Sequence, residues 1–589
     1  MRTTPIAVFM AFGTKGDVYP IAAIAAAFAC EMEQYDVVFI THSAHESLKV
    51  HLESKGVAFF PVSSPPVFAP HNLAGSNEKS FSLLKRQITT DHRRECVSIV
   101  ERVFGDDSSL ESDLMVINFF ALEGWSLAEL FCIRCVVAAP YVVPYSAPSS
   151  FERKFKKEYP ILYRYLCEAP ADKVGWNDVI HWMWPLFTEE WGSWRSLELS
   201  LSPCPFTVSH CYRRNSLSYM NGNSKALLSS YAQISMPIFS FMSLAQQNLR
   251  DDLFNDQARW RHMIHIADPT YWEKGLLLLY VNGPKVSIWF QDPVTGLPVW
   301  HDRPSSPLLM YGFSKEVVEC PGYWPSSVRV CGFWFLPCEW QFSCIRCAEI
   351  SVLASSKLLN TTDEFCPAHI QLPSFLASVS PEKPIFISLS SIGSMGYMSN
   401  PKAFLQLLGR VINISSHQFL LFTAGYEPLD TTIKLFAEKE LALSEQSQLS
   451  GDGVSLFGGR LFCFSGSIPY NWLFPRCAAV IHHGGSGSTA AALHSGTPQI
   501  LCPFCLDQFY WAERMFWIGV APEPLKRNHL IPDNDEDFHI KEAADAVVTA
   551  INSALSVEMR KRALDISEKI SFEDGVSEAV RILKEELSG

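Results

Sequence analysis

The stretch His482-His483-Gly484-Gly485-Ser486-Gly487-Ser488-Thr489 decides the fold of the second half of this chain. It lies between an apolar run, 477–481, and a helix-forming run that stops at Gly496-Thr497-Pro498, so it predicts a strand, a glycine-rich turn and a helix start. Glycines let the backbone approach a ligand closely, and the first N–H groups of a helix have no partner within it. Because the helix dipole adds positive potential there, the turn suits a phosphate or a diphosphate.

Strands and helices alternate in both halves of the chain. Apolar runs predict strands at 6–10, 36–41, 114–118 and 135–139, and again at 385–389, 419–423, 461–464, 478–481 and 499–502. Helical spacing continues to the end of the chain, over 541–555, 558–570 and 575–587. This alternation favours parallel sheets with helices on both faces, so we predict an α/β fold with two Rossmann-like βαβ domains facing each other across a cleft.

The length of 589 residues is too great for a single core. We predict an N-terminal domain over 1–350, an interdomain linker over 351–380 and a C-terminal domain over 381–589. Within the first domain, 255–305 is expected to be an irregular insertion, because Pro, Gly, Asp and Trp are scattered there without a clear period.

Charge and hydropathy exclude several classes of protein. The formal charge of −13 argues against a nucleic-acid partner, for which a basic stripe would be expected. The first apolar run is broken by Gly13, and no later run reaches the length of a membrane span, so we expect a cytoplasmic protein with reduced thiols. The basic and aromatic stretch 151–165 leaves peripheral membrane contact open, although an ordinary amphipathic helix is the favoured interpretation.

Two patterns resemble metal sites. Cys344 and Cys347, with Cys338 and Cys366 nearby, suggest a zinc knuckle, but the spacings are irregular and no His pair completes the set, so buried thiols are favoured. The run 533–535 imitates an Asp-x-Asp metal motif within an acidic stretch that is typical of a solvated loop. We predict no metal ion and no cofactor.

The nucleotide-binding motifs of other folds are absent from the chain: neither Gly-x-Gly-x-x-Gly after the first strand nor a P-loop occurs. Instead, 477–513 resembles the donor-binding signature of GT-B glycosyltransferases that use UDP-sugars, and among these the sterol 3-β-glucosyltransferase group. The matching segments are 471–477, His482-His483-Gly484-Gly485, 503–508 and 511–514, together with 13–20, 309–314, 332–336 and 573–576. The resemblance implies a GT-B fold, with an N-terminal acceptor-binding domain, a C-terminal donor domain and a final helix that crosses back to the first domain.

The resemblance also assigns the donor site. His483 is expected at the helix start, donating to the diphosphate together with the backbone N–H groups that follow Gly484 and Gly485, namely those of Ser486, Gly487, Ser488 and Thr489. His482 is weighed evenly between ligand and structural roles. Ser391 aligns with a family residue near the phosphates, in a loop where Ser390 replaces a family glycine. Asp507 and Gln508, a carboxylate and an amide, are expected to bind the hydroxyls of the donor sugar.

Asp17 is the candidate catalytic base. Transfer to a hydroxyl needs a group that accepts its proton, and Asp17 is the one carboxylate in the loop 11–20, at the position where the sterol group also has Asp. The alternative is that Asp17 merely caps the helix that begins near Tyr19-Pro20. His42 and His45 are weaker candidates for the base.

The resemblance therefore implies an inverting enzyme that moves a hexose, with UDP-glucose as the expected donor, to the hydroxyl of a lipophilic acceptor such as a sterol. Tyr141 and Tyr145 lie in the segment that matches the acceptor cleft of the family. Two alternatives stay open: a catalytically weak lipid- or nucleotide-binding protein of the same fold, and a glycosyltransferase acting on small phenolic acceptors.

Overall fold

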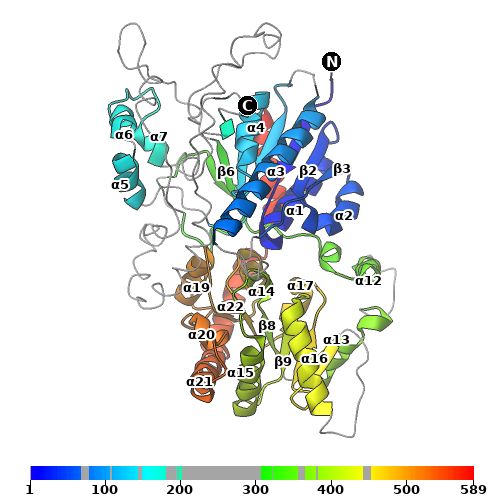
Figure 1. Cartoon of the computed structure of the whole chain (residues 1–589). Coiled ribbons are helices and arrows are strands. Elements are labelled where there is room, and N and C mark those ends of the chain that lie inside the picture. Colours follow the sequence, from blue (N-terminus) through cyan, green and yellow to red (C-terminus); the bar gives the residue numbers. More distant parts are fainter. Residues whose placement is uncertain are drawn as a thin grey trace, which may run out of the picture.

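Seven parallel strands form the sheet of the N-terminal domain, in the order β3-β2-β1-β4-β5-β6-β7. The computed structural model describes residues 2–67, 78–105, 109–142, 149–158, 160–180, 194–195, 198–199, 201, 307–320, 322, 324–355, 365–379, 383–441 and 453–588. The predicted insertion at 255–305 and Tyr145 therefore lie outside the described residues. Figure 1 shows the two domains one above the other, with both chain termini beside the N-terminal domain.

The elements of the first domain follow the predicted alternation. Its strands are β1 (Ile6–Met10), β2 (Asp36–His42), β3 (Val57–Val62), β4 (Leu114–Ile117), β5 (Arg134–Ala139), β6 (Leu308–Tyr311) and β7 (Val328–Val330). Its helices are α1 (Lys15–Glu31), η1 (Ser43–Leu48), α2 (Lys49–Glu53), α3 (Glu78–Phe104), α4 (Glu123–Phe131), α5 (Ser149–Glu158), α6 (Pro160–Cys167) and α7 (Trp176–Asp178).

Both faces of this sheet are covered, which explains the uninterrupted apolar runs of its strands. Successive side chains of a strand point to opposite faces. Accordingly, Val8 and Met10 pack with residues of α3 and α4, whereas Ala7 and Phe9 pack with residues of α1 and of the last helix of the chain.

The second domain holds a six-stranded sheet in the order β10-β11-β9-β8-β12-β13, parallel except for the β10–β11 pair. Its strands are β8 (Ile385–Ser388), β9 (Phe419–Phe422), β10 (Gly453–Leu456), β11 (Leu461–Phe464), β12 (Ala479–His482) and β13 (Gln499–Leu501). Its helices are α14 (Ser390–Ser394), α15 (Pro401–Ile414), α16 (Glu427–Leu441), α17 (Tyr470–Leu473), η12 (Phe474–Arg476), α18 (Ser486–His494), α19 (Gln508–Trp517), α20 (Arg527–Leu530), α21 (Asp537–Ala554), α22 (Val557–Ile570) and α23 (Gly575–Ser588).

The segment between the two sheets is folded onto the second domain. It contains η10 (Cys338–Gln341), α12 (Ile345–Ser355), η11 (Pro367–His369) and α13 (Gln371–Ser378). Cys347, Cys366 and Phe375 belong to the apolar cluster that covers one face of the second sheet. The interdomain linker over 351–380 stays a prediction as a domain boundary, but its described part is folded, because its apolar side chains join this cluster.

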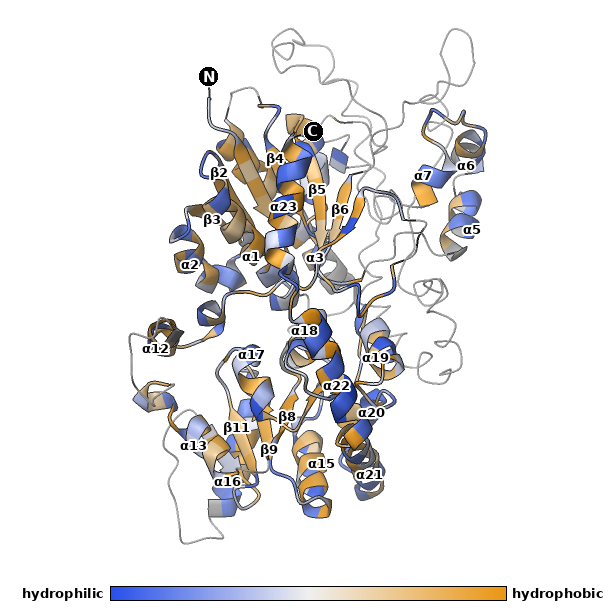
Figure 2. Ribbon diagram, turned by 180° about the vertical axis from the view of Figure 1, so that it is seen from behind, coloured by the Kyte–Doolittle hydropathy of each residue, from blue (hydrophilic) through white to orange (hydrophobic). Residues whose placement is uncertain are grey.

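The last helix, α23, crosses back to the first domain as predicted. Ala579, Val580 and Leu583 are buried against the first sheet, on the face that α1 also covers, and Figure 2 shows α23 lying against that sheet. Lys584 forms an ion pair with Glu31 of α1. Two parallel α/β domains joined by this return are the predicted GT-B architecture, which is confirmed.

The crossing depends on a close approach between two backbone segments. A Cβ atom on Gly575 would lie 2.4 Å from the carbonyl oxygen of Phe333, and the two glycines Gly332 and Gly575 are in contact. Ser314 donates to the Glu573 carboxylate at 2.7 Å. The motif segments 309–314, 332–336 and 573–576 thus meet in space and fix the return of the chain.

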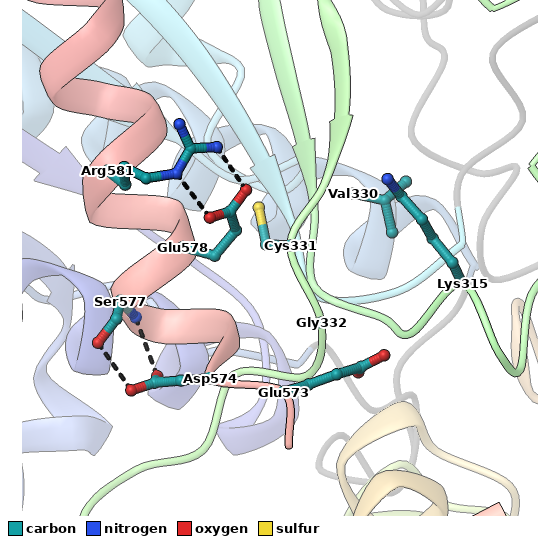
Figure 3. Close-up of a pocket in the computed structure, with 9 residues that line it drawn as sticks. All are labelled: Lys315, Val330, Cys331, Gly332, Glu573, Asp574, Ser577, Glu578 and Arg581. Carbon is teal, nitrogen blue, oxygen red and sulfur yellow. Dashed lines mark hydrogen bonds and ion pairs between the residues drawn. The ribbon is translucent and has the colours of Figure 1, made fainter. Parts of the chain in front are cut away.

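A cavity of about 480 Å³ opens beside this junction, between β7 and the start of α23 (Figure 3). Asp574 accepts hydrogen bonds from the N–H and hydroxyl of Ser577, and Glu578 pairs with Arg581 within the helix. The lining residues, Lys315, Val330–Gly332, Glu573, Asp574, Ser577, Glu578 and Arg581, include none of the predicted site residues.

The structure also bears on the expectations about membrane-spanning segments and about reduced thiols. Across the described residues, no helix is both long and apolar enough to cross a bilayer. Most cysteines in the described part of the chain are free, but Cys132 is disulfide-bonded, so the expectation of reduced thiols is wrong there. Spacing along the chain does not show which thiols the fold brings together.

Candidate active site

The predicted site residues follow the carboxyl ends of strands in both domains. Asp17 follows β1 and Tyr141 follows β5, whereas His483 follows β12 and Asp507 follows β13. Because the strands within each set are parallel, their carboxyl ends share one edge of the sheet. In Figure 2, α18 and α19 lie at the edge of the lower domain that faces the upper one.

The carboxyl groups of Asp17, in the first domain, and Asp507, in the second, interact across the domain boundary. Burial and, to a smaller extent, the negative charge of Asp17 raise the pKa of Asp507 to about 7. Burial also raises the pKa of Tyr141, and the charges of Asp17 and Asp507 both add to the rise. Three predicted residues from two domains are therefore close enough to influence one another, which no sequence spacing could show.

Asp17 lies at the third position of α1, and Thr14 binds its carboxylate. Oδ2 of Asp17 accepts from the backbone N–H of Thr14 at 2.6 Å and from the Thr14 hydroxyl at 2.8 Å. Burial raises the pKa of Asp17 to about 6, and the two hydrogen bonds from Thr14 oppose that rise. The capping interpretation of Asp17 is therefore confirmed, whereas its role as the base stays a prediction, and its charge also acts on Asp507.

The loop around Asp17 is held by Asn118, which the sequence analysis did not single out. Asn118, directly after β4, accepts from the N–H of Phe12 at 3.2 Å and donates to the carbonyls of Phe12 (2.8 Å) and Asp17 (3.2 Å). Gly13 has φ +106°, and a Cβ atom there would lie 2.6 Å from Asp17 Oδ2. A polar residue at the end of a buried strand was the available signal for Asn118.

His42 and His45 are structural in this arrangement. His42 contacts Ser64 at 3.1 Å, and His45 Nε2 lies 2.9 Å from the carbonyl of Gly13. Burial lowers the pKa of His42 to about 3 and lowers that of His45 as well. The His45 contact supports the loop that carries Asp17.

Asp507 and Gln508 have different environments despite being adjacent. Asp507 begins α19, and its Oδ2 accepts from the indole N–H of Trp511, a fully buried residue, at 3.0 Å. Gln508 is buried, and its amide oxygen accepts from the N–H groups of Phe504 (2.9 Å) and Cys505 (3.2 Å). The amide oxygen of Gln508 therefore stabilises its own loop, and Asp507 is the better placed of the two for a sugar hydroxyl.

The glycine-rich turn fixes its two histidines differently. His482 is buried, accepts at Nδ1 from the N–H of Gly484 at 3.1 Å, and lies with Nε2 2.9 Å from Gln499 Oε1. These two contacts assign the proton of a neutral imidazole to Nε2, and burial lowers the pKa of His482 to about 4. His482 is therefore a structural residue.

His483 turns towards the helix start instead. Its Nε2 would lie 2.5 Å from a Cβ atom on Gly485, so the imidazole occupies the space that this glycine leaves open. Burial lowers the pKa of His483 to about 3, with a smaller contribution from His482. Gly484 has φ +86°, and a Cβ atom there would lie 3.0 Å from the carbonyl oxygen of Gln508, which ties the turn to the Asp507 loop.

The start of α18 offers fewer backbone donors than predicted. The N–H of Thr489 donates to the carbonyl of Gly485 at 3.0 Å, and its side chain is fully buried. Thr489 as a backbone donor to the diphosphate is therefore wrong, because the first intrahelical hydrogen bond uses its N–H. The N–H groups of Ser486, Gly487 and Ser488 belong to the first turn, where helices leave their donors unpaired.

Ser391 lies in the short helix α14, directly after β8, but its side chain is outside the described part of the structure.

The acidic run 533–535, which imitates a metal motif, forms ion pairs with basic side chains: Asp533 pairs with Arg527, and Asp535 pairs with Lys402. Both carboxylates are largely exposed, as expected for a solvated loop.

Comparisons with known proteins find a family match in the second domain. Residues 460–564 match the family described as erythromycin biosynthesis protein CIII-like, C-terminal domain. A sterol 3-beta-glucosyltransferase of Arabidopsis thaliana is 39% identical over 115 residues, which is 20% of this chain and 16% of that protein. The chain thus spans about a sixth of that relative's length.

Longer matches have lower identity. A sterol 3-beta-glucosyltransferase of Debaryomyces hansenii is 27% identical over 283 residues, 47% of this chain and 14% of that protein. The O-mycaminosyltylonolide 6-deoxyallosyltransferase of Streptomyces fradiae is 27% identical over 288 residues, 48% of this chain and 50% of that protein. A UDP-glucosyltransferase structure from Polygonum tinctorium is 12% identical at a TM-score of 0.49, covering 100% of this chain and 99% of that one. Over these stretches the chain is similar to sterol 3-beta-glucosyltransferases, and its two-domain architecture is that of the GT-B fold.

Proposed function

We propose that this chain is an inverting UDP-sugar glycosyltransferase that moves glucose to the hydroxyl of a sterol-like acceptor. The observation that carries the proposal is the pair of carboxyl groups, Asp17 from one domain and Asp507 from the other, that interact beside a glycine-rich helix start. A transferase needs an acceptor base and a donor site within reach of each other, and this pair joins them.

Asp17 would be the base. Its pKa of about 6 leaves it mostly ionised at neutral pH while keeping it basic enough to accept a proton. As the acceptor oxygen forms its bond to the anomeric carbon, its proton passes to Asp17, and the bond from that carbon to UDP breaks with the electron pair leaving on the diphosphate. Attack opposite the leaving group inverts the anomeric centre.

The donor would lie along the start of α18. The N–H groups of Ser486, Gly487 and Ser488 and the helix dipole would stabilise the negative charge that develops on UDP. His483, whose ring lies over Gly485, would donate a further hydrogen bond. Asp507, with a pKa of about 7, would bind a sugar hydroxyl as either donor or acceptor.

The proposed acceptor rests on the matched relatives and on the aromatic side chains near the carboxyl groups of Asp17 and Asp507. The matched relatives in Arabidopsis thaliana and Debaryomyces hansenii are sterol 3-beta-glucosyltransferases. Tyr141 is buried and packs edge-on against Phe120, whose ring centroid lies 6.0 Å away. An aromatic wall of this kind suits a flat apolar acceptor.

Incubation of the purified chain with radiolabelled UDP-glucose tests the proposal. Sterols, flavonoids and a no-acceptor blank would be compared for the native protein and for Asp17→Asn, which keeps the size of the side chain. We expect transfer to a sterol, and a rate that falls by roughly 10²–10⁴ in the variant.

Each other outcome identifies an alternative. Transfer to flavonoids alone would favour a phenolic acceptor. UDP binding by calorimetry without transfer to either acceptor class would favour a binding protein of the same fold. A sterol transfer rate that Asp17→Asn leaves intact would refute Asp17 as the base.

A further inference from the structure

Four potential metal ligands converge in the segment that packs against the second sheet. The sulfur atoms of Cys344, Cys347 and Cys366 and a ring nitrogen of His369 all lie within 4.8 Å of one another. Cys344 immediately precedes α12, Cys366 immediately precedes η11, and His369 is the last residue of η11. The cluster thus joins two segments that are 19 positions apart at their nearest ligands, Cys347 and Cys366.

The separations match the edges of a zinc tetrahedron. With Zn–S near 2.3 Å and Zn–N near 2.05 Å, tetrahedral geometry places sulfur atoms about 3.8 Å apart and a sulfur and a nitrogen about 3.6 Å apart. Cys366 Sγ lies 3.9 Å from Cys344 Sγ and 3.6 Å from Cys347 Sγ. The Nδ1 atom of His369 lies 3.4 Å from Cys347 Sγ and 3.2 Å from Cys366 Sγ.

Zinc suits these four residues better than a disulfide, a set of plain buried thiols or an iron–sulfur cluster. A disulfide requires a sulfur separation of about 2.05 Å, whereas all three cysteines are free and the two separations from Cys366 are 3.9 and 3.6 Å. Ordinary buried thiols have no reason to gather with an imidazole nitrogen among them, because apolar neighbours would satisfy them equally well. Three thiolates and one imidazole are the donor set of structural zinc sites, whereas iron–sulfur clusters usually take four cysteines.

The surroundings are those of a structural site. Cys347 and Cys366 are buried in the apolar cluster that covers one face of the second sheet. The ring of His369 packs edge-on against Phe464 of β11, with centroids 6.1 Å apart. Next to the first ligand, Ser343 forms reciprocal hydrogen bonds with Ser467, which anchor that end of the segment to the domain.

We propose that Cys344, Cys347, Cys366 and His369 bind one Zn²⁺ ion, which fastens the interdomain segment onto the second domain. The ligand spacing is Cys-x₂-Cys followed by Cys-x₂-His. The proposal replaces the sequence interpretation of buried thiols without a metal. Cys338, which the sequence had grouped with these cysteines, is not part of the cluster, and His369 supplies the fourth ligand.

Metal analysis of the full-length protein tests this proposal directly. The chain would be produced in medium containing zinc, dialysed against a weak chelator and measured by inductively coupled plasma mass spectrometry. We expect one zinc per chain in the native protein and in Cys338→Ser, and almost none in Cys344→Ser or His369→Ala. Cys344 is the most accessible of the three cysteines to alter, since it is only partly buried.

Two measurements on the native protein do not depend on how a variant folds. Modification of the thiols with a mercurial reagent should release one zinc per chain, detected with a colorimetric chelator. Exchange of zinc for Co²⁺ should give the visible absorption of a tetrahedral site with thiolate-to-metal charge transfer. Absence of bound zinc in the native protein, or equal zinc in Cys344→Ser and Cys338→Ser, would overturn the proposal.

The outcome is independent of the proposed transfer reaction. None of the four ligands belongs to the candidate active site, so zinc content is measured without any sugar donor or acceptor. Loss of zinc should lower the thermal unfolding temperature of the protein, because binding energy at a structural zinc site is folding energy.

Discussion

The hydroxyl of Thr14 should set the pH at which the proposed base becomes active. It donates to Asp17 Oδ2 at 2.8 Å, alongside the backbone N–H of the same residue at 2.6 Å. Both hydrogen bonds favour the ionised carboxylate and oppose the effect of burial on its pKa, which is about 6. The change Thr14→Val removes the hydroxyl and leaves the backbone donor, so the pKa of Asp17 should rise.

The size of the rise follows from the strength of one hydrogen bond. A hydrogen bond to a charged group contributes about 1.5–3 kcal/mol, and 1.4 kcal/mol corresponds to about one pKa unit. Allowing for partial replacement by water, Thr14→Val should carry the pKa of Asp17 from about 6 to roughly 7. At pH 6 the ionised fraction, and with it kcat/KM, then falls by about fivefold, whereas at pH 8 the two proteins differ little.

The assay is the pH dependence of kcat/KM for transfer from UDP-glucose to a sterol. Thr14→Ser keeps the hydroxyl and should keep the native profile. Both substitutions disturb the start of α1, but a loss of helix stability would lower the rate at every pH rather than move the acidic limb. Asp507 also titrates near this range, so Asp507→Asn identifies which carboxyl group produces the limb.

Two results would refute the reasoning. An acidic limb that stays in place in Thr14→Val would show that the hydroxyl does not control the ionisation of the base. If the acidic limb disappears in Asp507→Asn while Asp17 is intact, the group that titrates is Asp507 of the donor domain and not the proposed base.

Three further substitutions test other parts of the structure. Gly485→Ala should displace the His483 ring, which lies 2.5 Å from the new methyl position, and weaken UDP binding about tenfold by calorimetry. Gly322→Ala, whose methyl group meets nothing within 4 Å and lies outside the proposed site, should bind UDP normally, and equal affinities of the two variants would contradict the placement of the ring. Gly575→Ala should lower stability by about 1–3 kcal/mol in thermal unfolding, because its methyl group meets a backbone carbonyl oxygen at 2.4 Å, and a stability equal to that of Gly322→Ala would exclude the close crossing. His482→Asn should flatten the pH dependence of the free energy of unfolding. A buried imidazole with a pKa of about 4 costs the folded state up to about 1.4 kcal/mol per pH unit as the pH falls below about 6.5. Denaturant unfolding at several pH values measures this slope, and an unchanged slope would exclude a neutral buried imidazole.

Much of the architecture could be predicted because it depends on local patterns. The buried strand Ile6–Met10 has the bounds that its apolar run indicates, and the helices at the end of the chain differ from the predicted ranges by a few residues. The structure of the segment between the sheets was harder to predict. Its sequence is mostly polar and Cys-rich, yet its few apolar side chains pack into the core of the second domain. Contacts between distant segments leave no periodic signal in the sequence.

The same limit applies to the candidate site. The glycines, His483 and the carboxylates Asp17 and Asp507 were identified from local patterns and the family resemblance. The roles of their neighbours were not, because Gln508 turns its amide oxygen into its own loop and Thr489 uses its N–H within the helix. Such roles depend on which donors and acceptors meet in the folded chain.

The sequence by itself determined that the chain forms two α/β domains and that a glycine-rich turn and a helix start follow the strand ending at His482. These features follow from side-chain periodicity and backbone freedom, which are properties of neighbouring residues. Only the tertiary structure decided that the carboxyl groups of Asp17 and Asp507 interact and that three cysteines and His369 converge. Both arrangements join residues far apart in the chain, and the packing of the sheets and of the segment between them, rather than any local pattern, brings such residues together.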